Sequence, residues 1–317
     1  MIFESFKSVA LLLLMAIPGF IIAKTHLVVK EQAVTFLSVF LLYVCQPFVT
    51  FNAFLKQDFD LNVLFNMLKI FLFIAFFIII MALIGKLLTK FIFKKATIED
   101  KRSISYAGSF GNMGYMAIPF LQLLFPGNYL VILYAASAIT AFNLVSWSFG
   151  IYLLSGDKRN MNIKKAIFNP ATISLLATLP FYILNINFVK YPLPGLQNLI
   201  NLFATMMGPL AMILVGLEMS DISLKELVSD PKVYFSSFIK LCISPVLAFA
   251  LISILSYFLD FTQITVNIIT AAAVPSANNL LMFSNKLGRS AKTPTKMVVI
   301  STILSILTIP IALNVFT

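Results

Sequence analysis

The sequence predicts an all-α membrane protein with ten transmembrane helices, arranged as two inverted five-helix repeats whose fourth and ninth helices are broken. Three observations lead to this fold class: the composition, the length of the apolar runs and the distribution of basic residues. Of the 317 residues, 60% are hydrophobic and only 11% are charged, and the mean hydropathy is +0.97. Soluble domains carry about 25% charged residues, so this composition indicates a membrane protein.

Long apolar runs define the expected helices, because about 20 apolar residues are needed to span the hydrocarbon core. The runs that meet this length are 8–24, 33–54, 63–84, 103–125, 130–154, 167–187, 197–219, 233–258, 264–285 and 295–315. The connections are short, and we expect a first repeat over residues 1–157 and a second over 158–317. The first run follows Lys7 and resembles the apolar part of a signal peptide. The charges of the following loop place its far end on the basic side, so we expect it to be retained as helix 1.

Basic residues alternate between the two sides of this helix arrangement. One side receives Lys24, Lys30, Lys86, Lys90, Lys94, Lys95, Lys101, Arg102, Lys158, Arg159, Lys164, Lys165, Lys225, Lys232, Lys286, Arg289, Lys292 and Lys296. The other side receives only Lys7, Lys56 and Lys190. Cytoplasmic loops carry an excess of Lys and Arg. We therefore expect the basic loops in the cytoplasm and both termini on the extracytoplasmic side of the inner or plasma membrane.

The basic loop after helix 5 divides the chain into two halves with five predicted helices each. An odd number of helices per half inverts the second half relative to the first, as in many secondary transporters. The prolines agree with this division: Pro47 and Pro209 fall in helices 2 and 7, and Pro119 and Pro275 fall in helices 4 and 9. The sequence therefore predicts an inverted repeat.

Helices 4 and 9 carry the residues least compatible with a continuous helix. Residues 108–119 (GSFGNMGYMAIP) contain three glycines, an asparagine and a proline, and residues 271–279 (AAAVPSANN) contain a proline followed by polar residues. Glycine and proline both weaken a helix interior. Backbone groups freed at such a break find no partner in lipid, so the break must be buried in protein or line a polar cavity.

Two interrupted helices at corresponding positions of the two halves point to a transporter's binding site. If the breaks face each other, the N-terminal ends of two half-helices converge, and this arrangement favours an anion. The alternative is that the small residues only permit close helix packing, with asparagines as interhelical hydrogen-bonding groups. The candidate substrate-binding residues are Gly111, Asn112, Gly114, Tyr115, Pro119, Asn143, Pro275, Ser276, Asn278, Asn279, Thr50 and Asn52.

Intramembrane charges are few. Lys69 and Lys240 lie about two turns into helices 3 and 8, where they either extend to the lipid headgroups or line the vestibules. Glu218 lies at the cytoplasmic end of helix 7, where we expect interfacial solvation. Either Na⁺ or H⁺ can serve as the coupling ion, and we expect no cofactor. No phosphate-binding loop, metal-ligand cluster or Ser/His/Asp set is visible, so the sequence does not predict an enzyme.

Five motifs resemble the auxin efflux carrier family, also called the auxin efflux carrier/malate permease group. They occur in the family's order along the whole chain: 111–119 (GNMGYMAIP), 169–173 (NPATI), 207–211 (MGPLA), 215–218 (VGLE) and 273–278 (AVPSAN). The likeness is to the bacterial malate or malonate permease branch. Plant members have a proline where Gly111 stands and a long loop between the halves, whereas this chain has a short one.

The resemblance implies a fold related to bile acid:sodium symporters, with helices 4 and 9 crossing at mid-membrane. Helices 1, 2, 6 and 7 would form a scaffold, and helices 3–5 and 8–10 would form a moving transport domain. Asn112, Pro119, Pro275 and Ser276 match the crossing segments. The implied function is alternating-access transport of a small organic anion such as a mono- or dicarboxylate; the alternative is a transport-inactive ligand sensor. The expected partners are this anion, the lipid bilayer and a second copy bound through the scaffold, with no nucleic acid.

Overall fold

The computed structural model describes residues 2–25, 27–220 and 230–317. The described residues are predominantly helical, and they contain no β-strand beyond a single isolated bridge. Within the described residues, seven helices are long and apolar enough to cross a membrane: Ile2–Lys24, Lys30–Phe54, Leu61–Ile92, Tyr129–Ser155, Pro194–Met219, Pro231–Leu255 and Lys292–Phe316. Lys225, which the charge pattern placed with the basic loops, lies outside the described residues. The all-α membrane fold is thus confirmed, while the number of crossings stays a prediction.

The long helices follow from sustained apolar sequence between clear end signals. Helix α4 (Leu61–Ile92) begins at Asp60, whose side chain accepts a hydrogen bond from the Asn62 backbone N–H and so caps the first turn. Its 32 residues reach about 48 Å at 1.5 Å per residue, which exceeds the hydrocarbon core of about 30 Å. Helix α2 (Lys30–Phe40) continues through the π-helical turn η1 (Leu41–Cys45) into α3 (Gln46–Phe54), where Pro47 lacks a backbone donor.

The fourth and ninth predicted helices are interrupted, as the sequence indicated. Helix α5 (Ile98–Ser109) ends before the π-helical turn η2 (Met113–Ala117), which leads into α6 (Ile118–Leu124). Helix α16 (Thr265–Ala273) ends before α17 (Asn279–Lys286). The sixth predicted helix is the short α10 (Pro170–Ile183), which Asn169 caps by accepting from the Thr172 N–H.

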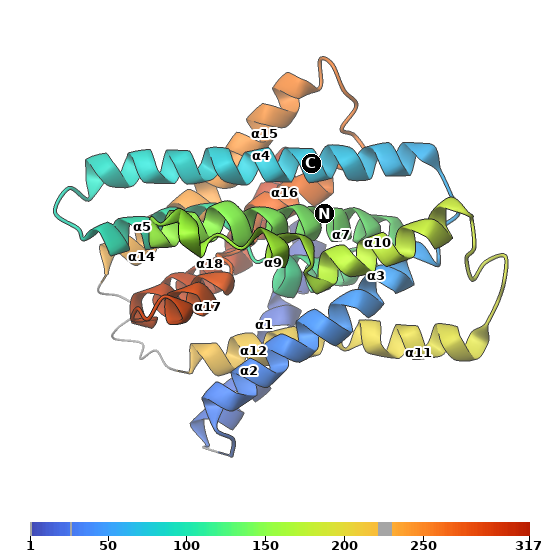
Figure 1. The fold of residues 1–317 in the computed structure, drawn as a ribbon, viewed down its shortest axis with the longest axis horizontal. Helices are drawn as coiled ribbons and strands as arrows, with labels where there is room; N and C mark the ends of the chain where they lie inside the picture. The colour runs from blue at the N-terminus through green and yellow to red at the C-terminus, as the bar shows by residue number, and fades with distance from the viewer. Residues whose placement is uncertain (1, 26, 221–229) are drawn as a thin grey trace.

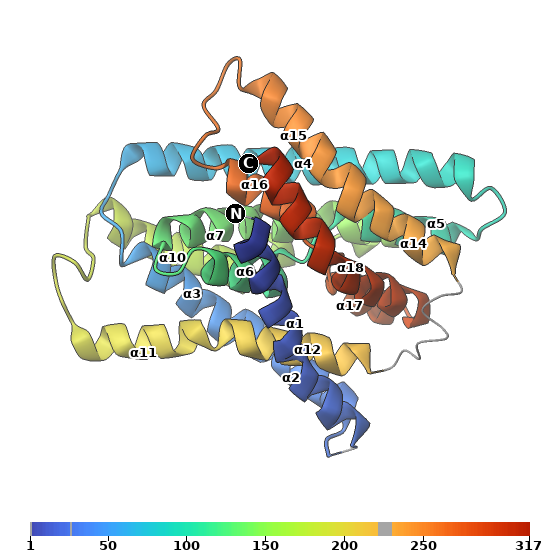
Figure 2. The same ribbon diagram turned by 180° about the vertical axis from the view of Figure 1, so that it is seen from behind.

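The remaining elements complete the chain. They are α1 (Ile2–Lys24), α7 (Tyr129–Val145), η3 (Ser146–Gly150), α8 (Ile151–Ser155), η4 (Lys158–Asn160), α9 (Ile163–Ile167), α11 (Pro194–Thr205), α12 (Met207–Met219), α14 (Pro231–Phe238), η5 (Ile239–Ile243), α15 (Ser244–Leu255) and α18 (Lys292–Phe316). In Figures 1 and 2, α4 and α11–α12 run on opposite sides of α7, with α15 projecting beyond α4 and α2 beyond α12.

The helices pack in two groups. Helix α1 lies along α12, and α3 packs on α10 and α11. Glycines allow the first contact, because a Cβ added at Gly216 would lie 1.9 Å from the Ala16 carbonyl oxygen. In the second group, α4 packs on α5 and α7, while α18 packs on α14 and α16. The two groups also contact each other, because α18 packs on α1 and α7 packs on α3. The first interrupted segment lies where these groups meet, since η2 contacts α12 as well as α7.

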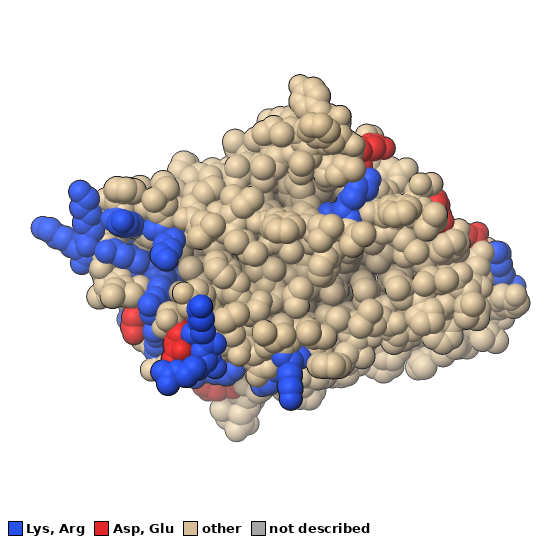
Figure 3. Space-filling model, turned by 45° about the horizontal axis from the view of Figure 1, so that its top comes forward, with Lys and Arg blue, Asp and Glu red and all other residues tan. Residues whose placement is uncertain are grey.

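Basic side chains gather at one end of the molecule. Figure 3 shows Lys and Arg concentrated where α4 ends and α5 begins, and a surface without charged residues over most of the remaining face. Two ion pairs connect the halves of the chain at this end: Lys232 with Asp100 at 2.6 Å, and Arg289 with Glu99 at 3.3 Å. This distribution agrees with the loop charges in the sequence.

Candidate functional site

The two interruptions cross each other in the interior. Gly111 and Ser276 form an antiparallel β-bridge, in which the Asn112 N–H donates to the Pro275 carbonyl at 2.7 Å and the Ala277 N–H donates to the Phe110 carbonyl at 2.9 Å. These backbone groups have no helical partner, and each break supplies the partner that the other needs. The crossing is therefore a built structural element that depends on both halves of the chain.

Ser276 holds the crossing in place. Its hydroxyl donates to the Ala107 carbonyl at 2.8 Å, and its backbone N–H donates to the Ser301 hydroxyl at 3.0 Å. The residue is completely buried. Ser276 thus connects the crossing to α5 and α18, and its side chain is occupied by the protein.

A small cavity lies beside the crossing. It has a volume of about 40 Å³ and is lined by Leu42, Gln46, Asn112, Met113, Gly114, Tyr115, Ile139, Phe142, Asn143, Ala277 and Asn279. The Asn112 side chain caps η2 by accepting from the Tyr115 N–H at 3.1 Å. A Cβ added at Gly114 would meet nothing within 4 Å, so the backbone of this half-helix borders open space. The volume has room for a few water molecules but not for a metabolite in this conformation.

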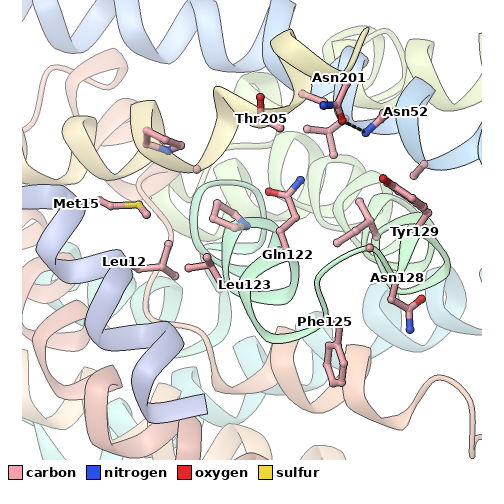
Figure 4. Close-up of a pocket in the computed structure, with 18 residues that line it drawn as sticks. Leu12, Met15, Asn52, Gln122, Leu123, Phe125, Asn128, Tyr129, Asn201 and Thr205 are labelled. Atoms are coloured by element: carbon pink, nitrogen blue, oxygen red, sulfur yellow. Dashed lines mark hydrogen bonds between the residues drawn. The ribbon is translucent and has the colours of Figure 1, made fainter. Parts of the chain in front are cut away.

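A larger cavity of about 330 Å³ lies between α1, α3, α6 and the α11–α12 helix. Figure 4 shows that labelled apolar side chains lie toward one end of this cavity and most of the labelled polar side chains toward the other. The apolar end holds Leu12, Met15 and Leu123, and the polar end holds Asn52, Gln122, Tyr129 and Asn201. The Asn52 amide donates to the Asn201 side-chain oxygen at 3.4 Å.

One cation lies next to this cavity. The Lys56 ammonium donates to the Tyr129 hydroxyl at 2.8 Å and lies 4.2 Å from the centre of its ring. Because Tyr129 lines the cavity, Lys56 places a positive charge beside its polar end.

The predicted site residues divide among three places. Gly111, Pro275 and Ser276 form the crossing itself; Asn112, Gly114, Tyr115, Asn143 and Asn279 line the small cavity; Asn52 and Pro119 line the larger one. Thr50 lines neither cavity, and its hydroxyl donates to the Gln46 carbonyl in its own helix at 3.2 Å. The structure therefore groups most of the predicted residues around the crossing and sets Asn52 and Pro119 apart.

The expectation for Glu218 was wrong. Glu218 is only 7% exposed, and one of its carboxyl oxygens accepts a hydrogen bond from the Asn278 side-chain amide at 2.7 Å. Asn278 also accepts from the Asn112 amide at 3.5 Å. Glu218 is thus an internal group that α12 directs toward the crossing, where interfacial solvation had been expected.

The two intramembrane lysines differ in burial and in hydrogen-bond partners. Lys69 is partly exposed and its ammonium donates to the Asp260 carbonyl at 2.5 Å, in the loop after α15. Lys240 is completely buried, and its ammonium donates to the Ala272 carbonyl at 2.7 Å. Both expectations for Lys240, extension to the headgroups and a place in a vestibule, were therefore wrong.

The sequence did not single out Gln46, Gln122, Tyr129 or Asn201, although all four line a cavity. The available signal was an uncharged polar side chain in or beside an apolar run, which Gln46 and Gln122 combine with a nearby proline. That signal is shared by many residues that only satisfy hydrogen bonds. Within the described residues, no group of three His, Cys, Asp or Glu side chains is placed to hold a metal ion.

The fold and the crossing define a polytopic membrane protein with polar breaks buried between two groups of helices. Residues 4–313 match the model of the family described as "Membrane transport protein", so the chain belongs to this membrane transport family, to which the auxin efflux carriers also belong. A comparison with curated proteins gives no match. The match confirms the family that the motifs indicated, and identifies the chain as a membrane transporter.

Proposed function

We propose that this chain is a secondary transporter that carries a small organic anion, such as a mono- or dicarboxylate, by alternating access. The observation that carries the proposal is the crossing of two interrupted segments, joined by the Asn112–Pro275 and Ala277–Phe110 backbone hydrogen bonds. Discontinuous helices that meet in the interior are the usual location of substrate sites in secondary transporters.

The proposed topology has ten crossings in two inverted halves. Three further helical segments, shorter than the seven long helices, support this topology because they fall where the other crossings were expected. They are 98–124 and 265–286, each a pair of interrupted helices, and the single helix Pro170–Ile183. The breaks occupy the fourth and ninth positions and pair with each other in antiparallel orientation. Equivalent breaks related in this way are expected of an inverted repeat.

Three features favour an anionic substrate. The half-helix Met113–Leu124 directs its N-terminal, positive end toward the small cavity beside Gly114. Amide side chains, which can donate to carboxylate oxygens, line both cavities. Lys56 adds a full positive charge beside the larger cavity, whose volume of about 330 Å³ falls in the range of pockets that enclose small ligands, about 300–1,000 Å³.

Alternating access would move one helix group against the other. The proposed scaffold is α1, α2–α3, α10 and α11–α12, and the proposed transport domain holds the other long helices and the crossing. Support comes from the packing of α1 with α12, of α3 with α10 and of α4 with α5 and α7. The contacts of α1 with α18 and of α3 with α7 would form the interface between the two groups. The larger cavity lies between the two groups and is lined by Asn128 and Tyr129 at the start of α7, opposite the basic loops in the proposed topology.

Counterflow in proteoliposomes tests this function. Vesicles containing the purified protein and an unlabelled mono- or dicarboxylate are expected to accumulate the labelled anion transiently, whereas protein-free vesicles are not. The anions for counterflow are first selected by a thermal-shift screen, as the carboxylates that raise the melting temperature of the purified protein. Stabilisation by cations or neutral sugars alone would contradict an anionic substrate, and a stabilising anion without counterflow would show a ligand sensor instead of a transporter.

A further inference from the structure

Lys240 is the buried cation of the crossing. It lies in the π-helical turn η5 (Ile239–Ile243) between α14 and α15, and its whole side chain is inaccessible to solvent. In the described part of the chain, no carboxylate lies within ion-pairing distance of it. Burying an ammonium group without compensation is costly, so its acceptors decide what it does.

Three acceptors surround the ammonium nitrogen. They are the carbonyl oxygen of Ala272 at 2.7 Å, that of Ala271 at 3.3 Å, and the hydroxyl of Ser244 at 3.4 Å. The Ser244 hydroxyl donates its own proton to the Ala272 carbonyl at 2.9 Å, so it can only accept from Lys240. Three acceptors match the three donors of a charged ammonium group.

The location of these acceptors is specific. Ala271 and Ala272 belong to the last turn of α16, which ends at Ala273 where the ninth segment breaks. The last carbonyls of a helix lack intrahelical partners, and the negative end of the helix dipole lies there. In transporters with discontinuous helices, such C-terminal ends and unwound carbonyls coordinate the coupling cation.

The opposite break is shaped around the same ammonium group. A Cβ at position 111 would lie 2.9 Å from both Cε and Nζ of Lys240 and 3.0 Å from the Ala271 carbonyl oxygen. A side chain at position 111 would therefore displace the lysine ammonium group from its place between the two breaks. Lys240 therefore contacts both interrupted segments at the point where they cross.

We infer that the Lys240 ammonium is a tethered cation, which occupies the position that a dissociable coupling cation would take at the end of α16. This inference rests on the proposed transport function. It follows that the crossing binds no Na⁺, and that anion binding and transport proceed without Na⁺. The tethered charge stays with the crossing because α14, α15 and α16 belong to the same packed group.

The first test compares cations with the wild-type protein. Uptake and thermal stability are measured in sodium chloride and in choline chloride of equal concentration. We expect both quantities to be the same in the two salts. The inference would be overturned by uptake about tenfold faster in sodium chloride than in choline chloride, which is a coupling of ordinary allosteric size. A higher melting temperature in sodium chloride would also overturn it.

The second test removes the tether. Lys240→Ala leaves a lysine-sized space beside the Ala271 and Ala272 carbonyls, and we expect the melting temperature and the uptake of this variant to fall in choline chloride. Ethylammonium or Na⁺ is expected to restore part of both, because either can supply the missing charge. Lys240→Met fills the space without charge, so we expect a loss that neither cation restores.

Lys69→Ala is the matched control, because Lys69 occupies the corresponding place in the other half and reaches a loop carbonyl. Its melting temperature is expected to show no cation dependence. Full activity of Lys240→Met, or no cation-dependent gain in Lys240→Ala, would overturn the inference. If Lys240→Ala does not fold, Lys240→Met and the wild-type salt comparison decide. The melting temperature needs no substrate, so a failure of the proposed transport function would be distinguished from a failure of this inference.

Discussion

The side-chain amide of Asn278 donates to a carboxylate oxygen of Glu218 across 2.7 Å. Glu218 lies on α12, which packs with α1 in the proposed scaffold, and Asn278 directly precedes α17 beside the crossing. The hydrogen bond therefore joins the two helix groups that alternating access would separate. Removing one partner of a buried hydrogen bond costs about 1–3 kcal/mol, so this pair stabilises the conformation seen in the structure.

Replacing Glu218 is expected to shift the population of that conformation. Glu218→Ala removes the acceptor and is expected to change the accessibility of the larger cavity by about tenfold, as a loss of 1.5 kcal/mol or more implies. Glu218→Gln keeps an amide oxygen as acceptor, so its effect is expected to be smaller. The measurement is the rate at which Thr205→Cys, in the cavity wall, reacts with a membrane-impermeant maleimide after Cys45→Ala and Cys242→Ser. Equal maleimide reaction rates with Glu218, Glu218→Ala and Glu218→Gln would show that the Glu218–Asn278 hydrogen bond does not stabilise this conformation.

Asn112→Ala is expected to abolish counterflow with little loss of folding. The substitution removes the cap that accepts from the Tyr115 N–H and the contact with Asn278, and loss of such a cap costs about 1 kcal/mol. Asn162→Ala is the matched control, since Asn162 caps α9 by accepting from the Lys165 N–H at 2.8 Å in an exposed loop. Both variants should lose similar stability by thermal shift, and only Asn112→Ala should lose transport. Wild-type counterflow in Asn112→Ala would remove this residue from the site.

The two glycines of the first break are expected to respond differently to an added methyl group. Gly111→Ala brings a Cβ against Lys240 and the Ala271 carbonyl, and overpacking of this kind costs about 1–3 kcal/mol. Gly114→Ala meets no atom within 4 Å, so the protein should keep its melting temperature. Its methyl group narrows the small cavity, and ligand binding should weaken. Equal melting temperatures for the two variants would contradict the close approach at Gly111.

Lys56→Met is expected to weaken anion uptake without loss of folding. Removing a charge beside the larger cavity costs about 1 kcal/mol of attraction in a solvated site, which corresponds to a several-fold rise in KM. The difference should shrink as salt is raised, because mobile ions screen exposed charges. Lys190→Met is the control: it removes a lysine from the same expected side, where Lys190 pairs with Asp58 at 3.7 Å. An equal rise in KM for both variants would indicate a general surface effect.

Most of the secondary structure was predictable, because long apolar runs and helix-breaking residues act locally. The predicted runs 33–54 and 197–219 agree closely with Lys30–Phe54 and Pro194–Met219. The two breaks were located correctly because glycine and proline weaken a helix wherever it packs. The candidate site was predictable only in part. Asn112 and Asn279 do border a cavity at the crossing, but Thr50 bonds within its own helix.

The sequence by itself determined the membrane class, the apolar segments and the presence of two interruptions. Only the tertiary structure decided which polar groups meet there. Lys69 and Lys240 stand at similar depths in their helices, yet one reaches a loop carbonyl and the other lies buried between the two breaks. The physical reason is that a buried charge can be stabilised by acceptors on segments far away in the chain. Its environment therefore depends on which helix ends pack against it. For Lys240 that partner is the end of α16, 31 residues or more along the chain.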